Sequence, residues 1–313
     1  MKKLLLISVI QPKTKINMNK LIPILLIILV VIVSGCTPAD TSQPETTTTT
    51  GPGQTQTEDW IQVGTKEVTP LVVFNNELYG LAPGFYTYKL QGNEWVKVGT
   101  EKVTPLLVFN NELYGRGPGP YTYKLQGNVW VKVGTKEVTP LVVFNNELYG
   151  YDYSFGPGFY TYKLQGNDWI QVGTKEVTPL VVFNNELYGY DYYLDYVYKL
   201  QGNDWIQMGT EKVIPTVVFN NELYGLAPGP YTYKLQRNEW VQVGTEEITL
   251  SVVFNNELYG YRSGSYAAYK LQGNEWVKVG IKAVTPSVVF NNELYGLGPG
   301  SYAYKLVKKS GTG

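Results

Sequence analysis

The sequence contains no histidine and one cysteine, Cys36, in its 313 residues. Without histidine the chain lacks the side chain that most often serves as a general base or as a metal ligand. A single cysteine cannot form a disulfide within the chain, and its place in the N-terminal segment excludes it as a thiol nucleophile. No glycine-rich phosphate loop follows a strand and opens a helix. We therefore expect no catalytic residue, no metal and no cofactor.

The sequence also has no excess of one charge, because its 26 Lys and Arg residues balance its 26 Asp and Glu residues. Five of the basic residues precede Cys36, and no basic stripe follows, so we do not expect nucleic acid as a partner. Asp152, Asp191 and Asp195 carry the oxygen ligands that Ca²⁺ prefers, but the spacing of a calcium-binding EF-hand is absent. Surface carboxylates of this kind are more often simply solvated.

No apolar run is long enough to span a bilayer comfortably. The longest run, residues 21–33, is broken by Pro23, follows several lysines and ends in the sequence VSGC, whose last residue is Cys36. These flanks are typical of an export signal, which could begin at Met1 or at Met18. The four residues resemble the lipobox of prokaryotic lipoproteins. The resemblance implies that Cys36 becomes the lipidated N-terminus of a protein anchored to the cell membrane or outer membrane; the alternative is a plain anchor helix.

The segment after the signal is poor in aromatic and aliphatic residues. Residues 37–58 consist mostly of Thr, Pro, Gln and Gly, with a pure threonine run at 46–50. Such a composition cannot bury enough apolar surface to offset the entropy of ordering the chain. We therefore expect a signal peptide over residues 1–35 and a disordered tether over residues 36–58.

Seven near-copies of one segment fill the rest of the chain. The sequence VVFNNELYG, or a close variant, begins at Val72, Leu107, Val142, Val181, Val217, Val252 and Val288. The tryptophans, Trp60, Trp95, Trp130, Trp169, Trp205, Trp240 and Trp276, recur at intervals of 35 to 39 residues. Self-similarity at this period predicts an array of small units that bury their apolar faces against one another.

Each copy is typical of four short antiparallel strands. In the first copy the expected strands cover residues 70–74, 77–80, 86–90 and 94–99. The first is an apolar run, and the third alternates bulky and polar residues. Two successive asparagines suit a tight type I′ turn between the first two strands, and Gln-Gly-Asn suits a second tight turn. Seven such units predict an all-β fold, a seven-bladed β-propeller with four-stranded antiparallel blades.

The order of an apolar strand, a Tyr-Gly strand, a Tyr-rich strand and a Trp resembles the kelch and galactose-oxidase-like propellers. Those repeats usually carry two adjacent glycines after the second strand, whereas Gly80 is followed by Leu81. The Trp-Asp ending of WD40 blades and the Asp box of sialidase-type propellers are absent. The alternative fold is an open solenoid of stacked hairpins, which needs capping units.

The two ends of the array favour a closed ring. Trp60–Gly64 is a fourth strand without a preceding blade, and the last copy stops after its third strand, Ser301–Leu306. We expect these two segments to pair, because closure removes exposed strand edges. The propeller should then cover residues 59–306 and leave a tail at 307–313. We expect a monomer in which Trp130 packs against its own or a neighbouring blade.

Within the array, the copies differ most between their second and third strands, and these loops should lie together at one end of the ring. Rigid scaffolds commonly bind through such loops, and aromatic rings with a few carboxylates suit sugars or peptide side chains. The candidate ligand-binding residues are Arg116, Tyr151, Asp152, Tyr153, Phe155, Tyr190, Asp191, Tyr192, Tyr193, Asp195, Tyr261 and Arg262.

These loops predict a tethered extracytoplasmic module that binds a glycan or a protein. Simple drift of the loops after duplication explains the same variation. An alternative function is a carbohydrate-active enzyme, a hydrolase or a lyase, with an Asp/Tyr site at the same loops. We favour binding, because catalysis needs one asymmetric site whereas the blades are nearly identical. The glutamate that follows the Asn-Asn turn recurs in all seven copies, so we expect it to be structural.

Overall fold

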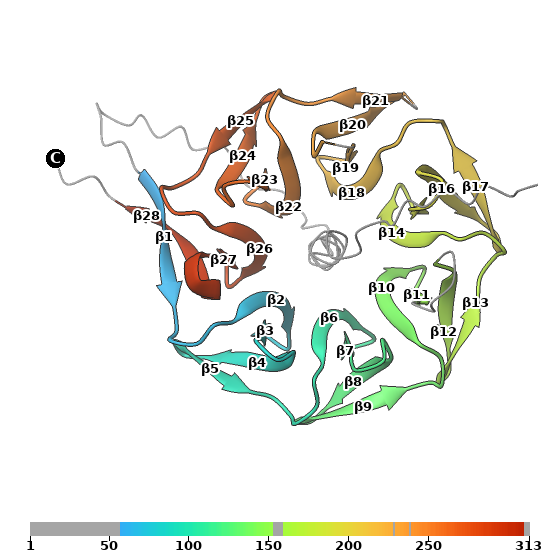
Figure 1. Cartoon of the computed structure of the whole chain (residues 1–313), viewed down its shortest axis with the longest axis horizontal. Coiled ribbons are helices and arrows are strands. Elements are labelled where there is room, and N and C mark those ends of the chain that lie inside the picture. The colour runs from blue at the N-terminus through green and yellow to red at the C-terminus, as the bar shows by residue number, and fades with distance from the viewer. Residues whose placement is uncertain (1–56, 153–158, 228, 238, 310–313) are drawn as a thin grey trace, which may run out of the picture.

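The computed structural model describes residues 57–152, 159–227, 229–237 and 239–309. Within these residues, 28 strands form seven four-stranded antiparallel sheets, which are arranged as the blades of a closed ring (Figure 1). The predicted all-β, seven-bladed propeller is therefore confirmed. One turn of 3₁₀ helix, η2 (Pro299–Ser301), precedes the last strand.

Each blade contains strands A to D, counted from the centre of the ring outward. Blade 1 consists of β2 (Thr69–Phe74), β3 (Glu77–Ala82), β4 (Tyr86–Gln91) and β5 (Glu94–Lys97). Blade 2 consists of β6 (Thr104–Phe109), β7 (Glu112–Arg116), β8 (Thr122–Gln126) and β9 (Val129–Val133). Blade 3 consists of β10 (Val138–Phe144), β11 (Glu147–Asp152), β12 (Thr161–Gln165) and β13 (Asp168–Gln171).

The remaining blades repeat this order. Blade 4 consists of β14 (Thr178–Phe183), β15 (Glu186–Asp191), β16 (Tyr196–Gln201) and β17 (Asp204–Met208). Blade 5 consists of β18 (Ile214–Phe219), β19 (Glu222–Leu226), β20 (Thr232–Gln236) and β21 (Glu239–Gln242). Blade 6 consists of β22 (Ile248–Phe254), β23 (Glu257–Arg262), β24 (Ala268–Gln272) and β25 (Glu275–Lys278). Blade 7 consists of β26 (Thr285–Phe290), β27 (Glu293–Leu297), β28 (Ala303–Lys309) and β1 (Thr57–Val63).

The Asn-Asn turns have the backbone conformation that the sequence predicts. In all seven blades both asparagines between strands A and B have positive φ, between 48° and 59°. A type I′ turn needs positive φ at both central residues, and asparagine tolerates it better than most residues. The glycine of the Tyr-Gly pair is required for a different reason, which is steric. A Cβ on Gly80 would lie 2.5 Å from the Thr69 carbonyl oxygen, so a side chain is excluded where strands A and B approach closely.

Every A strand contains an irregularity that the sequence analysis did not predict. The pairing register with strand B shifts between Pro70 and Val72 in blade 1 and at the same place in the other six blades. Blade 6 has Leu250 in place of the proline and still shows the shift, so proline is not its cause. The extra residue is buried in each blade; it is Leu71, Leu106, Leu141, Leu180, Thr216, Ser251 and Ser287.

The core lies between the blades. Trp130 is 3 % exposed and belongs to a cluster with Leu113 and Leu125 of its own blade and with Val72 and Tyr79 of blade 1. The same arrangement recurs around the ring: the tryptophan of one blade shares a cluster with the tyrosine of the Tyr-Gly pair in the preceding blade. The prediction that Trp130 packs against its own or a neighbouring blade is confirmed, and its side chain packs against both.

The ring closes through the two ends of the array. Strand β1 pairs antiparallel with β28, with Trp60 opposite Leu306 and Val63 opposite Ala303, as predicted. The paired strands begin at Thr57 and end at Lys309, so they reach beyond the expected propeller boundaries of 59 and 306. A hydrogen bond from Ser287 Oγ to the Pro70 carbonyl at 2.9 Å joins blade 7 to blade 1 at the inner strands.

Candidate functional site

The two ends of the B strands define two sides of the ring. The turn side carries the Asn-Asn turns between strands A and B, and the loop side carries the loops between strands B and C. The links from one blade to the next lie beside these loops. The Tyr160 hydroxyl donates to Glu176 at 3.2 Å, and Lys212 pairs with Asp195 at 3.2 Å, each joining a loop to a link.

Three tyrosines that the sequence analysis proposed as ligand contacts are buried on the loop side. Tyr151, Tyr190 and Tyr261 lie at the ends of β11, β15 and β23 and have almost no exposed surface. Burial raises the pKa of the Tyr261 hydroxyl to about 12. These strands continue two residues beyond the Tyr-Gly glycine, which places the three rings inside the blades. Their role in this structure is packing.

An aromatic cluster joins the loops of blades 3 and 4. Tyr151 meets Phe159 edge-on with ring centroids 5.6 Å apart, Phe159 meets Tyr192 at 6.4 Å, and Tyr192 meets Tyr190 at 5.1 Å. Such edge-to-face pairs stabilise beyond the area they bury. Tyr192 is therefore mostly a packing residue as well, and burial raises the pKa of its hydroxyl. The cluster joins the long loops of two blades, so loop length in this chain is coupled to packing.

Two of the proposed aspartates hold the backbone of their loops. Asp152 Oδ1 accepts the Tyr160 amide hydrogen at 2.8 Å. Asp191 Oδ1 accepts the amide hydrogens of Tyr193 and Leu194 at 2.8 and 2.9 Å. Both aspartates are buried, and carboxylates that accept local amide hydrogens are typical of tight turns. These bonds give Asp152 and Asp191 a structural role.

The remaining charged candidates lie nearer the solvent. Asp195 accepts a hydrogen bond from the Tyr190 hydroxyl at 3.3 Å in addition to its pairing with Lys212. Arg262 forms an ion pair with Glu246 of the preceding link, and its guanidinium lies 5.5 Å from the centroid of the Tyr269 ring. Arg116 ends β7 and is partly buried. Two other candidates, Tyr153 and Phe155, lie outside the described residues, as does Cys36.

Large apolar side chains are exposed on the loop side. They are Phe85 in blade 1, Tyr193 and Leu194 in blade 4, Tyr266 in blade 6 and Ile281 in the link to blade 7, with exposed fractions of 65, 71, 50, 60 and 82 %. Sequence reasoning selected Tyr193 and missed the other four. Leu194 stands within the selected blade 4 loop but is neither aromatic nor charged, and Ile281 lies in a link and not in a loop. Phe85 and Tyr266 lie in loops that differ little from the ordinary length, so loop variation does not reveal them.

Two of these exposed aromatic residues have a strained backbone. Phe85 has φ of 66° and Tyr266 has φ of 55°. Bulky residues rarely adopt positive φ, and such strain is concentrated at binding and active sites. The Tyr266 ring also lies parallel to the buried Tyr261 ring, with centroids 6.5 Å apart and planes 10° apart, which fixes its orientation.

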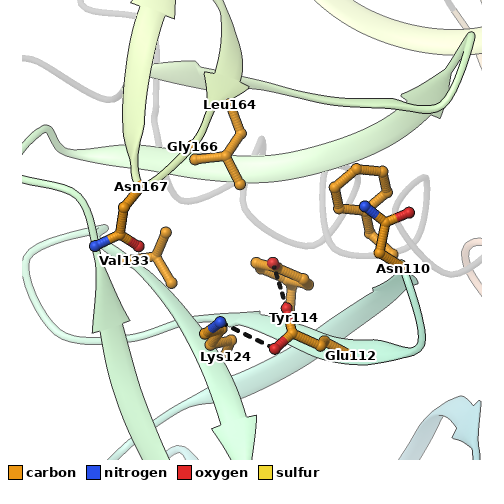
Figure 2. Close-up of a pocket in the computed structure, with 9 residues that line it drawn as sticks. Asn110, Glu112, Tyr114, Lys124, Val133, Leu164, Gly166 and Asn167 are labelled. Atoms are coloured by element: carbon orange, nitrogen blue, oxygen red, sulfur yellow. Dashed lines mark hydrogen bonds and ion pairs between the residues drawn. The ribbon is translucent and has the colours of Figure 1, made fainter.

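The turn side contains a groove between blades 2 and 3, with a volume of about 340 Å³ (Figure 2). Asn110, Glu112, Tyr114 and Lys124 of blade 2 line one wall, together with Phe109 and Val133. Leu164, Gly166 and Asn167 of blade 3 line the other wall. The groove therefore belongs to neither blade alone.

A polar cluster lies in this groove. Glu112 Oε1 pairs with Lys124 Nζ at 2.9 Å, and Glu112 Oε2 accepts the Tyr114 hydroxyl hydrogen at 3.0 Å, as the dashed lines in Figure 2 show. The Lys124 ammonium, together with the Tyr114 hydroxyl, holds the pKa of Glu112 below its ordinary value. Burial and the bond to Glu112 raise the pKa of Tyr114. The same Tyr–Glu–Lys arrangement recurs in all seven blades.

Among the described residues, no group of three or more Asp, Glu, Cys or His side chains is arranged to hold a metal ion. The described part of the chain also contains no helix that is both long and apolar enough to cross a membrane.

Comparison with known proteins identifies the fold through structure alone. No protein family matches the sequence, and no curated protein does. BamB from Moraxella catarrhalis is similar in structure with a TM-score of 0.51 and 13 % identity, over 79 % of this chain and 84 % of that one. YCF48 from Cyanidioschyzon merolae is similar with a TM-score of 0.59 and 10 % identity, over 79 % of this chain and 98 % of that one.

Two further solved structures share the architecture. YCF48 bound to D1 peptide has a TM-score of 0.58 and 14 % identity, over 80 % of this chain and 97 % of that one. The WD40 propeller domain of Doa1 has a TM-score of 0.58 and 7 % identity, over 81 % of this chain and 97 % of that one. At these identities the likeness shows the β-propeller fold and not a kelch-type relationship.

Proposed function

We propose that this protein is a lipid-anchored, extracytoplasmic binding module whose loop side holds a protein partner. The observation that carries the proposal is the exposed set Phe85, Tyr193, Leu194, Tyr266 and Ile281, which we call the loop-side apolar set. Exposed aromatic residues are enriched at protein interfaces because they contribute large contact areas at low entropic cost.

The distribution of the set favours a protein over a small ligand. Its members come from blades 1, 4 and 6 and from the link between blades 6 and 7, so they lie around the ring. A single sugar unit is too small to touch several blades, whereas a standard protein interface buries roughly 800 Å² on each partner. The same fold accommodates a peptide in YCF48, which supports a protein partner for this chain.

A carbohydrate-active enzyme receives no support from the loop-side aspartates. Asp152 and Asp191 use carboxylate oxygens to hold backbone amides, which is a structural role. We therefore propose a binding function and not a hydrolase or lyase activity.

Photo-crosslinking in cells that produce the full chain tests the partner. A benzoylphenylalanine in place of Tyr193 should give one discrete protein adduct, and the same adduct should form from Phe85 and Tyr266. Val241, an exposed residue on the outer strand β21, is the matched control and should give none. Because one partner spans several blades, Phe85→Ser with Tyr266→Ser should remove the adduct at residue 193.

Three outcomes contradict the protein partner. The first is an equal adduct from Val241, and the second is the absence of protein adducts from all three loop positions. The third is an adduct that a glycosidase degrades and a protease leaves intact, which would assign the loop side to a glycan.

The anchor is proposed from the sequence around Cys36 and has its own test. Lipidation should place the full chain in the membrane fraction, and Cys36→Ala should release the exported protein from it. A variant that stays in the membrane with the apolar run 21–33 still attached would show an anchor helix in place of a lipid.

A further inference from the structure

The residue types that line the groove between blades 2 and 3 recur at four other interfaces of the ring. At the interfaces 1/2, 2/3, 3/4, 5/6 and 7/1, the first blade supplies a Phe, an Asn, a Glu, a Tyr, a Lys and a Val. The second blade supplies a Leu, a Gly and an Asn at each of them. The Glu–Lys pairs at the other four interfaces are Glu77–Lys89, Glu147–Lys163, Glu222–Lys234 and Glu293–Lys305, with N–O distances of 2.7 to 3.1 Å.

Two interfaces differ from these five. At interface 4/5, Met208 and Arg237 replace the Val and the Gly. At interface 6/7 there is no hairpin from strand C to strand D, because strand D of blade 7 is β1 from the other end of the array. Glu58 of β1 approaches Lys270 at 3.3 Å there, in addition to the Glu257–Lys270 pair. Within one chain, five interfaces with the intact residue set can therefore be compared with two in which the set is altered.

Stability alone does not explain why the Glu–Lys pair recurs. In the groove of Figure 2 the Glu112 and Lys124 side chains are 36 % and 24 % exposed, and partly exposed ion pairs contribute only about 0–1 kcal/mol. The exposed loops of the same blades have diverged in length and composition. Because both side chains keep exposed surface in the groove, they are accessible to a ligand in addition to pairing with each other.

The chemistry of the groove fits a neutral sugar. The carboxylate of Glu112 and the ammonium of Lys124 compensate each other's charge, so the groove selects neither an anion nor a cation. Each keeps hydrogen-bonding capacity, since the ammonium has three donors and the carboxylate about four acceptor sites. Asn110 and Asn167 add amide groups, and Phe109 and Leu164 provide apolar walls. A pyranose ring has a matching rim of hydroxyls and an apolar face.

The size of the groove agrees with this ligand class. Its volume of about 340 Å³ lies at the lower end of the range for ligand pockets, about 300–1,000 Å³. We propose that the five interfaces with the intact residue set are equivalent carbohydrate-binding sites, each taking one or two units of a neutral glycan. Several weak sites on one rigid ring bind a repetitive glycan tightly, because each later contact is intramolecular.

The test uses the full chain in detergent and immobilised polymers that carry glucose, galactose, mannose or N-acetylglucosamine. At least one polymer should bind. Native mass spectrometry with the free form of that sugar should saturate at five copies per chain. Glu112→Gln should lower the stoichiometry to four. The same change at Glu77, Glu112, Glu147, Glu222 and Glu293 together should weaken polymer binding by about 100-fold or more.

The matched control is Glu257→Gln at the altered interface 6/7, which should leave five sugars bound. A circular dichroism melt checks that each variant is folded, and Lys124→Gln provides a second variant of the same groove. Failure of all four polymers to bind would overturn the proposal, as would one sugar per chain or an equal loss from Glu257→Gln. Tyr193→Ser should leave sugar binding unchanged, so the failure of this proposal and that of the loop-side partner are distinguishable.

Discussion

The turn side and the loop side of the ring are formed at the two ends of the same seven B strands, but the residues that adopt positive φ differ between them. On the turn side the residues with positive φ between strands A and B are asparagines in every blade. On the loop side Phe85, Asp195, Tyr266 and Ser301 adopt positive φ, although three of them are not residues that tolerate it well. The turns between strands A and B are thus chemically matched to their backbone, whereas the loops between strands B and C are held in place by their surroundings.

This difference separates the residues that turn geometry fixes from the loop residues that it leaves free to vary. A two-residue turn between strands A and B admits few conformations, so the same two residues recur at each turn. The loops from strand B to strand C have no such restriction, because insertions on the surface cost little entropy. Strained aromatic residues on these loops are therefore the stronger evidence for a binding role, and the repeated turns are evidence for the scaffold. Five experiments test this contrast, from the largest expected effect to the smallest.

Deletion of residues 57–63 should have the largest effect, because it removes β1 and opens the ring. Strand β28 would lose its seven-residue pairing and expose an edge, which invites association with another chain. We expect loss of the cooperative melt or formation of oligomers in light-scattering chromatography. Deletion of seven tether residues, 44–50, is the control and should leave a monomer with an unchanged melt. A monomeric 57–63 deletion with the same melt would show that the ring does not depend on closure.

Trp130→Ala should lower the free energy of unfolding by about 3–5 kcal/mol, because it leaves a cavity between blades 1 and 2. Val131→Ala is the matched control on the exposed face of the same strand and should change it by less than about 0.5 kcal/mol. Urea titrations of both variants measure the difference. A loss under about 1 kcal/mol for Trp130→Ala would show that the tryptophans are surface groups and not the core.

The fold and its closure could be predicted because the repeat makes the signals redundant. Trp60–Gly64 and Ser301–Leu306 showed a matched excess and deficit, and both ends paired as expected. The bulge after Pro70 could not be predicted, because the apolar run of strand A does not show where its pairing register shifts, and the shift also occurs in blade 6, which lacks the proline. The burial of several loop-side candidates could not be predicted from the sequence either. Tyr151 and Tyr190 belong to variable segments, yet contacts with a neighbouring blade bury them. The spacing of residues along the sequence does not reveal such contacts.

Asn146→Val tests the turn side directly, and Tyr193→Ser tests the loop side. Asn146 has φ of 57°, which costs a β-branched residue roughly 1–2 kcal/mol, so the turn variant should lose about that much stability. Tyr193 is exposed, and its removal should change stability by less than about 0.5 kcal/mol while abolishing the partner adduct. Thermal melts provide the measurement. Equal losses from the two variants would remove the distinction between the two sides.

Arg237→Gly should stabilise the ring by about 0.5–1 kcal/mol. Arg237 has φ of 49° at a hairpin position where five other blades have glycine with φ between 59° and 62°. A Cβ at those glycines would meet no neighbouring atom, so the backbone conformation alone makes glycine preferable there. Gly202→Arg in blade 4 is the reciprocal variant and should destabilise by a similar amount. The same sign for both changes in urea titrations would contradict the role of backbone strain.

The smallest effect should come from the Tyr–Glu–Lys clusters, and it should depend on pH. The Lys163 ammonium, together with the Tyr149 hydroxyl, holds the pKa of Glu147 below its ordinary value of 4.5. The folded chain therefore gains stability from the ionised carboxylate above pH 4.5, and this gain is lost as the pH falls through the lower pKa of the folded state. Because the side chain of Glu147 is 40 % exposed, solvent screening keeps the gain below about 0.5 kcal/mol. Glu147→Gln should therefore melt slightly below the unchanged chain at pH 7 and together with it near pH 3, whereas a constant difference across this range would show that the carboxylate acts through packing and not through its charge.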